Sequence, residues 1–308
     1  MQQVSGRFNR PPRRLAKAAV RRLIDHYYWA GKRTFYQRLI RQRYRQRATE
    51  VLRTSEPVLY QSMREMLAAL GLDVELPHKK FGDALFLLTY FRQHRPRLIL
   101  ECGAGLSTLV FAYAMNEARV ADGYRGRIVS MEQDNEFLKH CVQPYLTDTQ
   151  LQNVEFHSSS TAQEYFLDEK TGVGYIGDFY TDVPINAYDL IFIDGPVNHH
   201  GVQVALPDST RITERGKTFS ADYLNVLRTI EETVPVVIDQ RLDTRWKIVE
   251  LVHGSQMERY HYAAMKFEIA VSPKNVAALK RLPVQTIDKG ESLYLPLGQK
   301  SPPRPSNL

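Results

Sequence analysis

The chain has 308 residues, of which 43% are hydrophobic and 24% are charged, so it is long enough for one large α/β domain plus an appendage, or for two small domains. Its two cysteines, Cys102 and Cys141, are too few for a disulfide framework, which favours a reducing compartment and predicts a cytoplasmic protein. The sequence shows neither a run of about 18 apolar residues nor a signal-peptide core, so we expect no transmembrane helix and no secretory leader.

The net charge of +7 is concentrated at the N-terminus. Residues 1–50 contain 14 Lys and Arg against Asp25 and Glu50, a balance of +12, so the remainder must carry −5. Two amphipathic helices are expected there, at Arg13–Tyr28 and Thr34–Val51, within a basic helical extension of residues 1–55. This segment could bind the anionic inner face of a membrane, or it could bind nucleic acid. The mixture of aromatic and basic residues favours the membrane over nucleic acid. Alternatively, it packs its apolar face on the domain and leaves its arginines in water.

The rest of the chain alternates between apolar strands and helices. This pattern predicts an α/β fold: a doubly wound, mostly parallel seven-stranded sheet within residues 56–300, followed by a loose tail at 301–308. Helices are expected at Pro57–Leu70, Phe81–Gln93, Leu106–Ala118, Asn135–Cys141, Ser220–Glu232 and Arg245–His253. Strands are expected at Arg97–Glu101, Arg127–Glu132, Asn153–His157, Tyr188–Asp194, Val234–Asp239, Ala263–Val271 and Ser292–Leu297. The stretches before strand four and from Val197 to Lys217 have a loop-like composition, with a short strand around Tyr175–Tyr180.

The first strand ends in a glycine-containing turn, Glu101-Cys102-Gly103-Ala104-Gly105, and a helix follows. Such a turn brings backbone N–H groups and a helix N-terminus close to a nucleotide-like ligand. The turn lacks the third glycine of a G-x-G-x-x-G fingerprint, and no Gly-Lys-Ser/Thr follows it, which excludes a P-loop. Cys102 is expected to be a small buried hydrophobic residue rather than a nucleophile.

Acidic residues stand at the carboxyl ends of four expected strands: Glu101, Glu132, Asp194 and Asp239. Because parallel strands bring these ends to one edge of the sheet, the four acids are expected to line one crevice there. Glu132 ends the second strand, a position from which a carboxylate can bind ribose hydroxyls.

The turn Glu101–Gly105, continuing into Ser107 and Thr108, resembles motif I of the class I S-adenosylmethionine-dependent methyltransferases. Glu132 matches the ribose-binding acid of that family. The segments 192–196 (Phe-Ile-Asp-Gly-Pro) and 177–180 (Gly-Asp-Phe-Tyr) resemble a subset that methylates small molecules or sugars, often on oxygen. The resemblance implies a Rossmann-like methyltransferase fold and S-adenosylmethionine as cofactor, with these cofactor-binding residues: Glu101, Gly103, Gly105, Ser107, Glu132, Ser159 and Asp194. Ser159 lies in a serine run where many members place an acid or amide near the adenine, which is a departure from the family.

Methyl transfer to a hydroxyl needs a base or a metal. His199 and His200 follow the fourth strand in a loop expected over the pocket, and either could be the base, as could Asp194; the histidines could also be ordinary surface residues. Asp194 and Asp239, with Gln240, could hold a divalent cation, although Gln240 replaces the Asn of the metal-dependent enzymes, so metal is not favoured.

Arg241 and Arg245 follow the fifth strand and could contact an anionic acceptor, or lie in solvent.

The sequence therefore predicts an S-adenosylmethionine-dependent methyltransferase whose acceptor is a small molecule, a sugar or a lipid-linked glycan. Two alternatives remain open: an NAD(P)-dependent oxidoreductase, and a non-catalytic membrane-associated module with the same fold.

Overall fold

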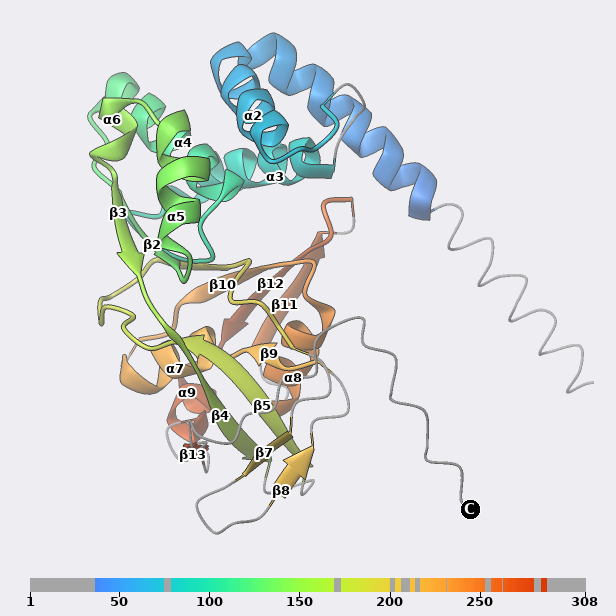
Figure 1. The fold of residues 1–308 in the computed structure, drawn as a ribbon, viewed down its shortest axis with the longest axis vertical. Coiled ribbons are helices and arrows are strands. Elements are labelled where there is room, and N and C mark those ends of the chain that lie inside the picture. Colours follow the sequence, from blue (N-terminus) through green and yellow to red (C-terminus); the bar gives the residue numbers. More distant parts are fainter. Residues whose placement is uncertain are drawn as a thin grey trace, which may run out of the picture.

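The computed structural model describes residues 37–74, 79–168, 173–199, 203–205, 211–213, 217–230, 232–252, 256–261, 263–279 and 284–286. The expected helix Arg13–Tyr28, the expected strand Ser292–Leu297, the tail 301–308 and the side chain of His200 lie outside these residues. Figure 1 shows the described chain, with the N-terminal helices gathered at one end and a long hairpin reaching toward the other.

A seven-stranded sheet forms the centre of the fold. Its strands are β1 (Leu98–Cys102), β2 (Arg127–Glu132), β3 (Val154–Ser158), β6 (Leu190–Ile193), β10 (Pro235–Asp239), β11 (Gln256–His261) and β12 (Lys266–Val271). They lie in the order β11-β12-β10-β6-β1-β2-β3, and only β12 runs antiparallel to its neighbours. The expected fold class, a doubly wound and mostly parallel seven-stranded sheet, is confirmed.

Helices cover both faces of this sheet. One group comprises residues 37–55, α2 (Pro57–Ala69), α3 (Lys79–His94), α4 (Leu106–Asp122), α5 (Asn135–Phe137) with a π-helical turn at Leu138–Val142, and α6 (Asp148–Leu151). The other group comprises α7 (Asp222–Thr229), α8 (Leu242–Leu251) and α9 (Pro273–Leu279).

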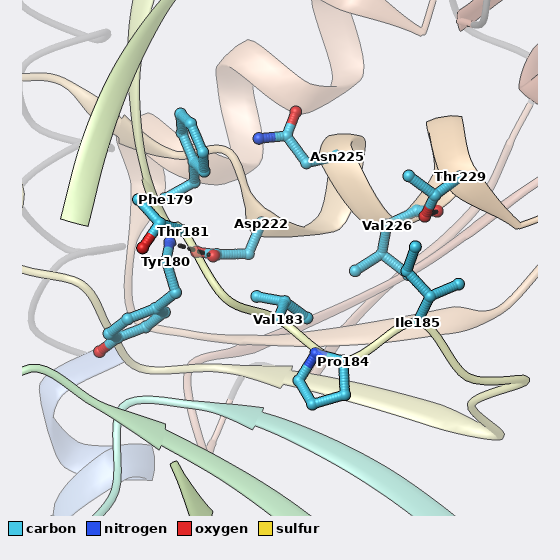
Figure 2. A pocket seen from close by; sticks show the side chains of 10 residues that line it. All are labelled: Phe179, Tyr180, Thr181, Val183, Pro184, Ile185, Asp222, Asn225, Val226 and Thr229. Carbon is cyan, nitrogen blue, oxygen red and sulfur yellow. Dashed lines mark hydrogen bonds between the residues drawn. The ribbon is translucent and has the colours of Figure 1, made fainter. Parts of the chain in front are cut away.

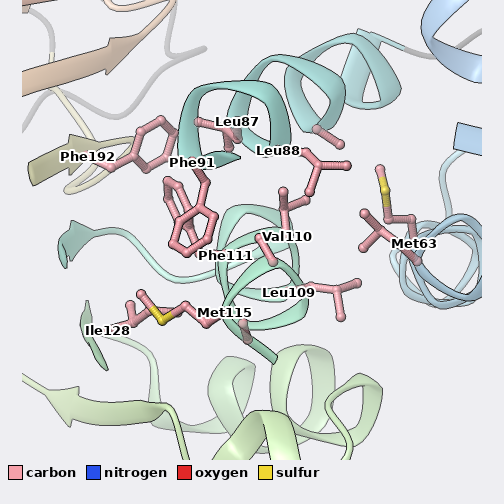
Figure 3. Packing of buried hydrophobic residues seen from close by; sticks show 14 of the residues in the cluster. Met63, Leu87, Leu88, Phe91, Leu109, Val110, Phe111, Met115, Ile128 and Phe192 are labelled. Atoms are coloured by element: carbon pink, nitrogen blue, oxygen red, sulfur yellow. The ribbon is translucent and has the colours of Figure 1, made fainter. Parts of the chain in front are cut away.

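The two faces carry separate hydrophobic cores, because successive side chains of a strand point to opposite sides. In β1, Ile99 packs into the core shared with α2, α3 and α4, which Figure 3 shows. Its neighbours Leu100 and Cys102 pack into the core shared with α7 and α8. Cys102 is fully buried, as expected, and burial raises the pKa of its thiol well above the usual range.

The helix formed by residues 37–55 packs on the domain. Tyr44, Ala48 and Leu52 recur every four residues on its inner face; Ala48 and Leu52 are fully buried, and the Tyr44 hydroxyl donates to the Gly82 carbonyl at 3.2 Å. Leu52 belongs to the same core as α3 and α4. No helix in the described part of the chain is long and apolar enough to cross a membrane.

Three segments differ from the expectation. The stretch after β3 forms a long hairpin of β4 (Thr161–Asp168) and β5 (Val173–Tyr180), which with β9 (Phe219–Ser220) and β13 (Val284–Thr286) makes a four-stranded second sheet. Within Val197–Lys217, β7 (Gln203–Ala205) pairs with β8 (Arg211–Thr213). The expected strand Ala263–Val271 begins only at Lys266, because residues 263–265 form the turn that joins it to β11.

Candidate functional site

The two glycines of the turn after β1 have different surroundings. Gly103 has a positive φ of 97°, and a Cβ there would lie 2.6 Å from the backbone nitrogen of Gly195, so only glycine fits where the ends of β1 and β6 meet. A Cβ on Gly105 would have no atom of the described residues within 4 Å apart from those of its own chain neighbours. Gly105 therefore borders open space at the carboxyl edge of the sheet, where ligands of doubly wound folds bind.

Glu101 stabilises this turn through hydrogen bonds of its side chain. Its carboxylate is fully buried, and Oε2 accepts hydrogen bonds from the hydroxyls of Thr108 and Ser130, both at 2.6 Å. Thr108 in turn accepts a hydrogen bond from the Gly105 N–H at 2.9 Å. Burial raises the pKa of Glu101 to about 7, against the opposing effect of the neighbouring hydroxyls, including that of Ser107. Oε1 is also buried and has no hydrogen-bond partner of normal geometry among the described residues.

Glu132 ends β2 beside the turn. Its Oε1 accepts hydrogen bonds from the backbone N–H groups of Gln133 and Asp134, at 2.8 and 3.1 Å. Burial raises the pKa of Glu132, and the nearby backbone N–H groups, that of Ala104 among them, oppose this. The side chain thus lies close to the glycine turn, as the ribose-binding interpretation requires.

Ser159, by contrast, is 3% exposed, and its hydroxyl already takes part in the connection between β3 and β4. It donates to the Ser160 carbonyl at 3.1 Å and accepts from the Asp182 N–H at 3.2 Å. The predicted cofactor contact of Ser159 would therefore compete with these internal hydrogen bonds.

Asp194 and Asp239 lie at the ends of the adjacent strands β6 and β10, and lysines stand against both. Lys80, in the first turn of α3, has its Nζ 3.6 Å from Asp194 Oδ2 and 3.9 Å from Asp239 Oδ2. Lys266 is fully buried and donates to Asp239 Oδ1 at 2.5 Å and to Asp83 Oδ1 at 2.6 Å. Sequence reasoning missed Lys80, Asp83 and Lys266, because their partners lie up to 183 residues away in the chain.

These charges set the protonation of the two strand-end acids. Burial and the charge of Asp239 raise the pKa of Asp194 to about 6, while Lys80 and Arg241 oppose the shift. For Asp239, burial favours the neutral form, but the ammonium groups of Lys266 and Lys80 outweigh it, so its pKa falls.

Lys80 therefore occupies the position between the two carboxylates that a cation would take. Gln240, the third side chain of the considered metal site, donates to Asp83 at 3.4 Å instead. Within the described ranges, no three His, Cys, Asp or Glu side chains are grouped so that they could hold a metal ion.

Arg241, between β10 and α8, is hydrogen-bonded to the loop that follows β6. Its guanidinium donates to the carbonyls of Asp194 and Pro196, the latter at 2.6 Å, and to Asn198 Oδ1 at 3.1 Å. Its donors are used within the protein, which argues against the predicted contact with an anionic acceptor. Arg245 lies over the Phe267 ring, 5.8 Å from its centroid.

His199 lies beside a buried acid. Its Nδ1 is 3.6 Å from Oδ2 of Asp178, a β5 residue that is only 2% exposed. Asp178 also accepts hydrogen bonds from Gln163, at 2.7 Å, and from the Thr218 hydroxyl. His199 and Thr218 exchange two further hydrogen bonds, through the His199 N–H at 2.7 Å and the His199 carbonyl at 2.8 Å. A histidine whose Nδ1 faces a fixed carboxylate can present Nε2 as a proton acceptor.

No protein-family model matches the chain. No curated protein matches it either. Among solved structures, a methyltransferase from Geobacter sulfurreducens is similar at 11% identity and a TM-score of 0.38, covering 69% of this chain and 88% of that one. A proposed O-methyltransferase from Klebsiella pneumoniae gives 16% identity and a TM-score of 0.38, covering 70% and 89% of the two chains. These values are too low to support an inference about activity, so the fold class rests on the sheet topology of the chain itself.

Proposed function

We propose that the chain is an S-adenosylmethionine-dependent methyltransferase that methylates an oxygen atom. The observation that carries this proposal is the open carboxyl edge of β1, where Gly105 borders free space next to a buried Glu101 whose Oε1 accepts no hydrogen bond of normal geometry from the described residues. A ligand with an ammonium group and a ribose fits this edge. The carboxylates of Glu101 and Glu132 belong to the ends of adjacent strands, and both can accept hydrogen bonds from such a ligand.

In this proposal, Glu101 Oε1 accepts a hydrogen bond from the cofactor's ammonium group, directly or through water. The backbone of Gly103–Gly105 lies along the amino-acid end of the cofactor, Ser107 adds a hydroxyl at the helix start, and Glu132 binds the ribose hydroxyls. S-adenosylmethionine supplies an electrophilic methyl group on a sulfonium when it is bound.

The chain's own chemical task is then to orient the acceptor hydroxyl and remove its proton. We assign this task to His199: Nε2 takes the proton, and the negative charge of Asp178, whose Oδ2 lies 3.6 Å from Nδ1, stabilises the resulting imidazolium. Asp194, which Lys80 and Arg241 flank, is better suited to provide negative potential near the sulfonium than to act as the base.

The acceptor is proposed to be a small molecule, a sugar or a lipid-linked glycan, on the sequence resemblance alone. The basic segment of residues 1–50 would hold such an enzyme at the cytoplasmic face of an anionic membrane.

The test is turnover with S-adenosylmethionine carrying a labelled methyl group, over a panel of hydroxylated small molecules, sugars and lipid-linked glycans. We expect label transfer to at least one acceptor, loss of this transfer in His199→Ala, and weakened cofactor binding in Glu132→Ala. If Glu132→Ala binds the cofactor as tightly as the parent protein, the ribose assignment is wrong. Tight NAD(P)H binding without S-adenosylmethionine binding would favour the oxidoreductase alternative.

A further inference from the structure

A cavity of about 220 Å³ lies between α7 and the segment that follows β5. Figure 2 shows its lining, which includes the aliphatic side chains of Val183, Pro184 and Ile185 from the segment after β5, and of Val226 from α7. Asn225 and Thr229 complete the α7 side. Ile185 is 72% exposed, so an apolar side chain stands unprotected at the mouth of the cavity. A lining of this kind suits a small apolar group.

Asp222, the first residue of α7, places a carboxylate in this apolar lining. The residue is 1% exposed, and its Oδ1 accepts a hydrogen bond from the Tyr180 N–H at 2.8 Å, drawn as a dashed line in Figure 2. Its Oδ2 accepts no hydrogen bond from the described residues. A buried carboxylate oxygen without a donor costs free energy, which a ligand with a donor group would recover.

The charges around Asp222 indicate which donor fits best. Burial, together with the negative charge of Asp178, raises the pKa of Asp222 to about 7. Arg241 acts in the opposite direction, but its guanidinium is bonded to Pro196, Asn198 and Ser220. Burial is the main cause of this shift, and a cationic donor would pair with the buried carboxylate better than a neutral one because it also compensates the buried charge.

This cavity is separate from the open edge at Gly105. Tyr180 lies between them: its backbone N–H donates to Asp222, while its hydroxyl lies against Gly195, where an added Cβ would be only 2.6 Å away. A ligand in the cavity would therefore contact the residue that borders the glycine turn.

We propose that this cavity is a binding site for a small primary amine with a short branched apolar chain. The ammonium group donates to Asp222 Oδ2, and the apolar chain packs against Val183, Ile185 and Val226. This proposal does not depend on the methyltransferase assignment.

The experiment is a titration of the full chain with isobutylamine hydrochloride at pH 7.5, in which binding is measured by calorimetry and by ligand-observed NMR. Isobutanol tests the need for the charge, and methylamine tests the need for the apolar chain. We expect saturable binding of isobutylamine and at least tenfold weaker binding of both comparison ligands. Equal binding of isobutanol, equal binding of methylamine, or no binding of isobutylamine would each overturn the proposal.

Two variants locate the site. Asp222→Asn removes the charge at nearly constant volume and is expected to weaken isobutylamine binding at least tenfold. Asp182→Asn is the matched control, because Asp182 is an exposed aspartate of the segment after β5, next to the cavity, whose side chain does not line it. If Asp222→Asn does not fold, Ile185→Ala replaces it; shortening this exposed residue is expected to weaken binding of isobutylamine but not of methylamine. Unchanged isobutylamine binding in the folded variant would overturn the proposal.

Discussion

The ammonium nitrogen of Lys80 lies 3.6 Å from Asp194 Oδ2 and links the first turn of α3 to the end of β6. Its charge stabilises the ionised form of Asp194 against burial and against Asp239, and the balance leaves the pKa of Asp194 at about 6. The N-terminal helices thus contribute directly to the electrostatics of the sheet edge, which neither the glycine turn nor the strand pattern indicated.

Lys80→Met is predicted to raise the pKa of Asp194 above 6, because the opposing positive charge is lost while burial and Asp239 remain. Carbon-detected NMR titration of the aspartate carboxyl groups measures this shift. Lys139→Met is the control, since Lys139 pairs with Glu136 on the surface. An Asp194 pKa that is unchanged in Lys80→Met would contradict the assigned electrostatics.

Gly105→Ala is predicted to weaken cofactor binding without affecting folding, and Gly103→Ala is predicted to lower the stability of the fold. The methyl group at 105 clashes with no atom of the described residues, so the fold should persist while S-adenosylmethionine affinity falls roughly tenfold or more. The methyl group at 103 clashes with Gly195 at a positive φ, which should cost on the order of 2 kcal/mol in the free energy of unfolding. Thermal unfolding and calorimetric titration distinguish the two effects; normal affinity in a folded Gly105→Ala protein would show that the open space is not the cofactor site.

Glu101→Gln is predicted to change how stability depends on pH. The folded protein keeps the Glu101 proton up to a pKa of about 7, whereas the unfolded chain releases it near its ordinary value. The unfolded state therefore binds fewer protons between these values, and the free energy of unfolding of the parent protein falls as pH rises from about 4.5 to 7.

The free energy of unfolding of the Gln variant does not fall in this way, because Gln has no proton to release. The variant should therefore become more stable relative to the parent protein as pH rises from about 4.5 to 7, by at most about 3 kcal/mol for this pKa shift. Denaturant unfolding at pH 5 and pH 8 measures the difference. A stability difference that is the same at both pH values would show that Glu101 does not titrate in this range.

His199→Ala is predicted to lower kcat by roughly 100-fold or more, because the acceptor's proton would lose its base. Asp178→Asn should also lower kcat, since the imidazolium that forms on proton removal would lose the nearby negative charge of the carboxylate. His140→Ala is the matched control, because His140 pairs only with surface Glu136 among the described contacts. Full activity of both site variants would remove His199 from the mechanism.

Replacing Arg13, Arg14, Arg21 and Arg22 together by Gln is predicted to reduce cosedimentation with vesicles that contain anionic lipid. The four charges lie in the segment whose balance is +12, and each lysine or arginine near such a surface contributes about 1 kcal/mol. Vesicles of neutral lipid are the control. Equal sedimentation of the parent and the variant would instead favour the interpretation that these arginines lie in water.

The parts of the fold that could be predicted are those with a local signal. The boundaries of β2 match the expectation, and those of β1 and β3 differ by one residue, because each strand has a local signal: an aliphatic run in β1, a mainly apolar stretch in β2 and an alternation of apolar and polar residues in β3. β11 was missed because the charged residues Glu258 and Arg259 interrupt it, as is common in an edge strand.

The candidate site also has a part with a local sequence signal and a part without one. The turn 101–105 was visible because its glycines and acid are contiguous, whereas the pairing of Lys266 with Asp83 joins residues that no local pattern connects. His199 could be named from its place after β6, but its carboxylate partner belongs to a hairpin that was expected to be mostly loop. Long-range ion pairs of this kind depend on the sheet order, which fixes which strand ends meet.

The most direct measurement of the central claim is calorimetric titration of the parent protein and of Gly105→Ala with S-adenosylmethionine, with NADH and NADPH as competing ligands. The account predicts one S-adenosylmethionine bound per chain, at least tenfold weaker binding in Gly105→Ala, and no binding of either nicotinamide cofactor. Absence of S-adenosylmethionine binding to the folded parent protein, or tight binding of NADH or NADPH at this site, would contradict it.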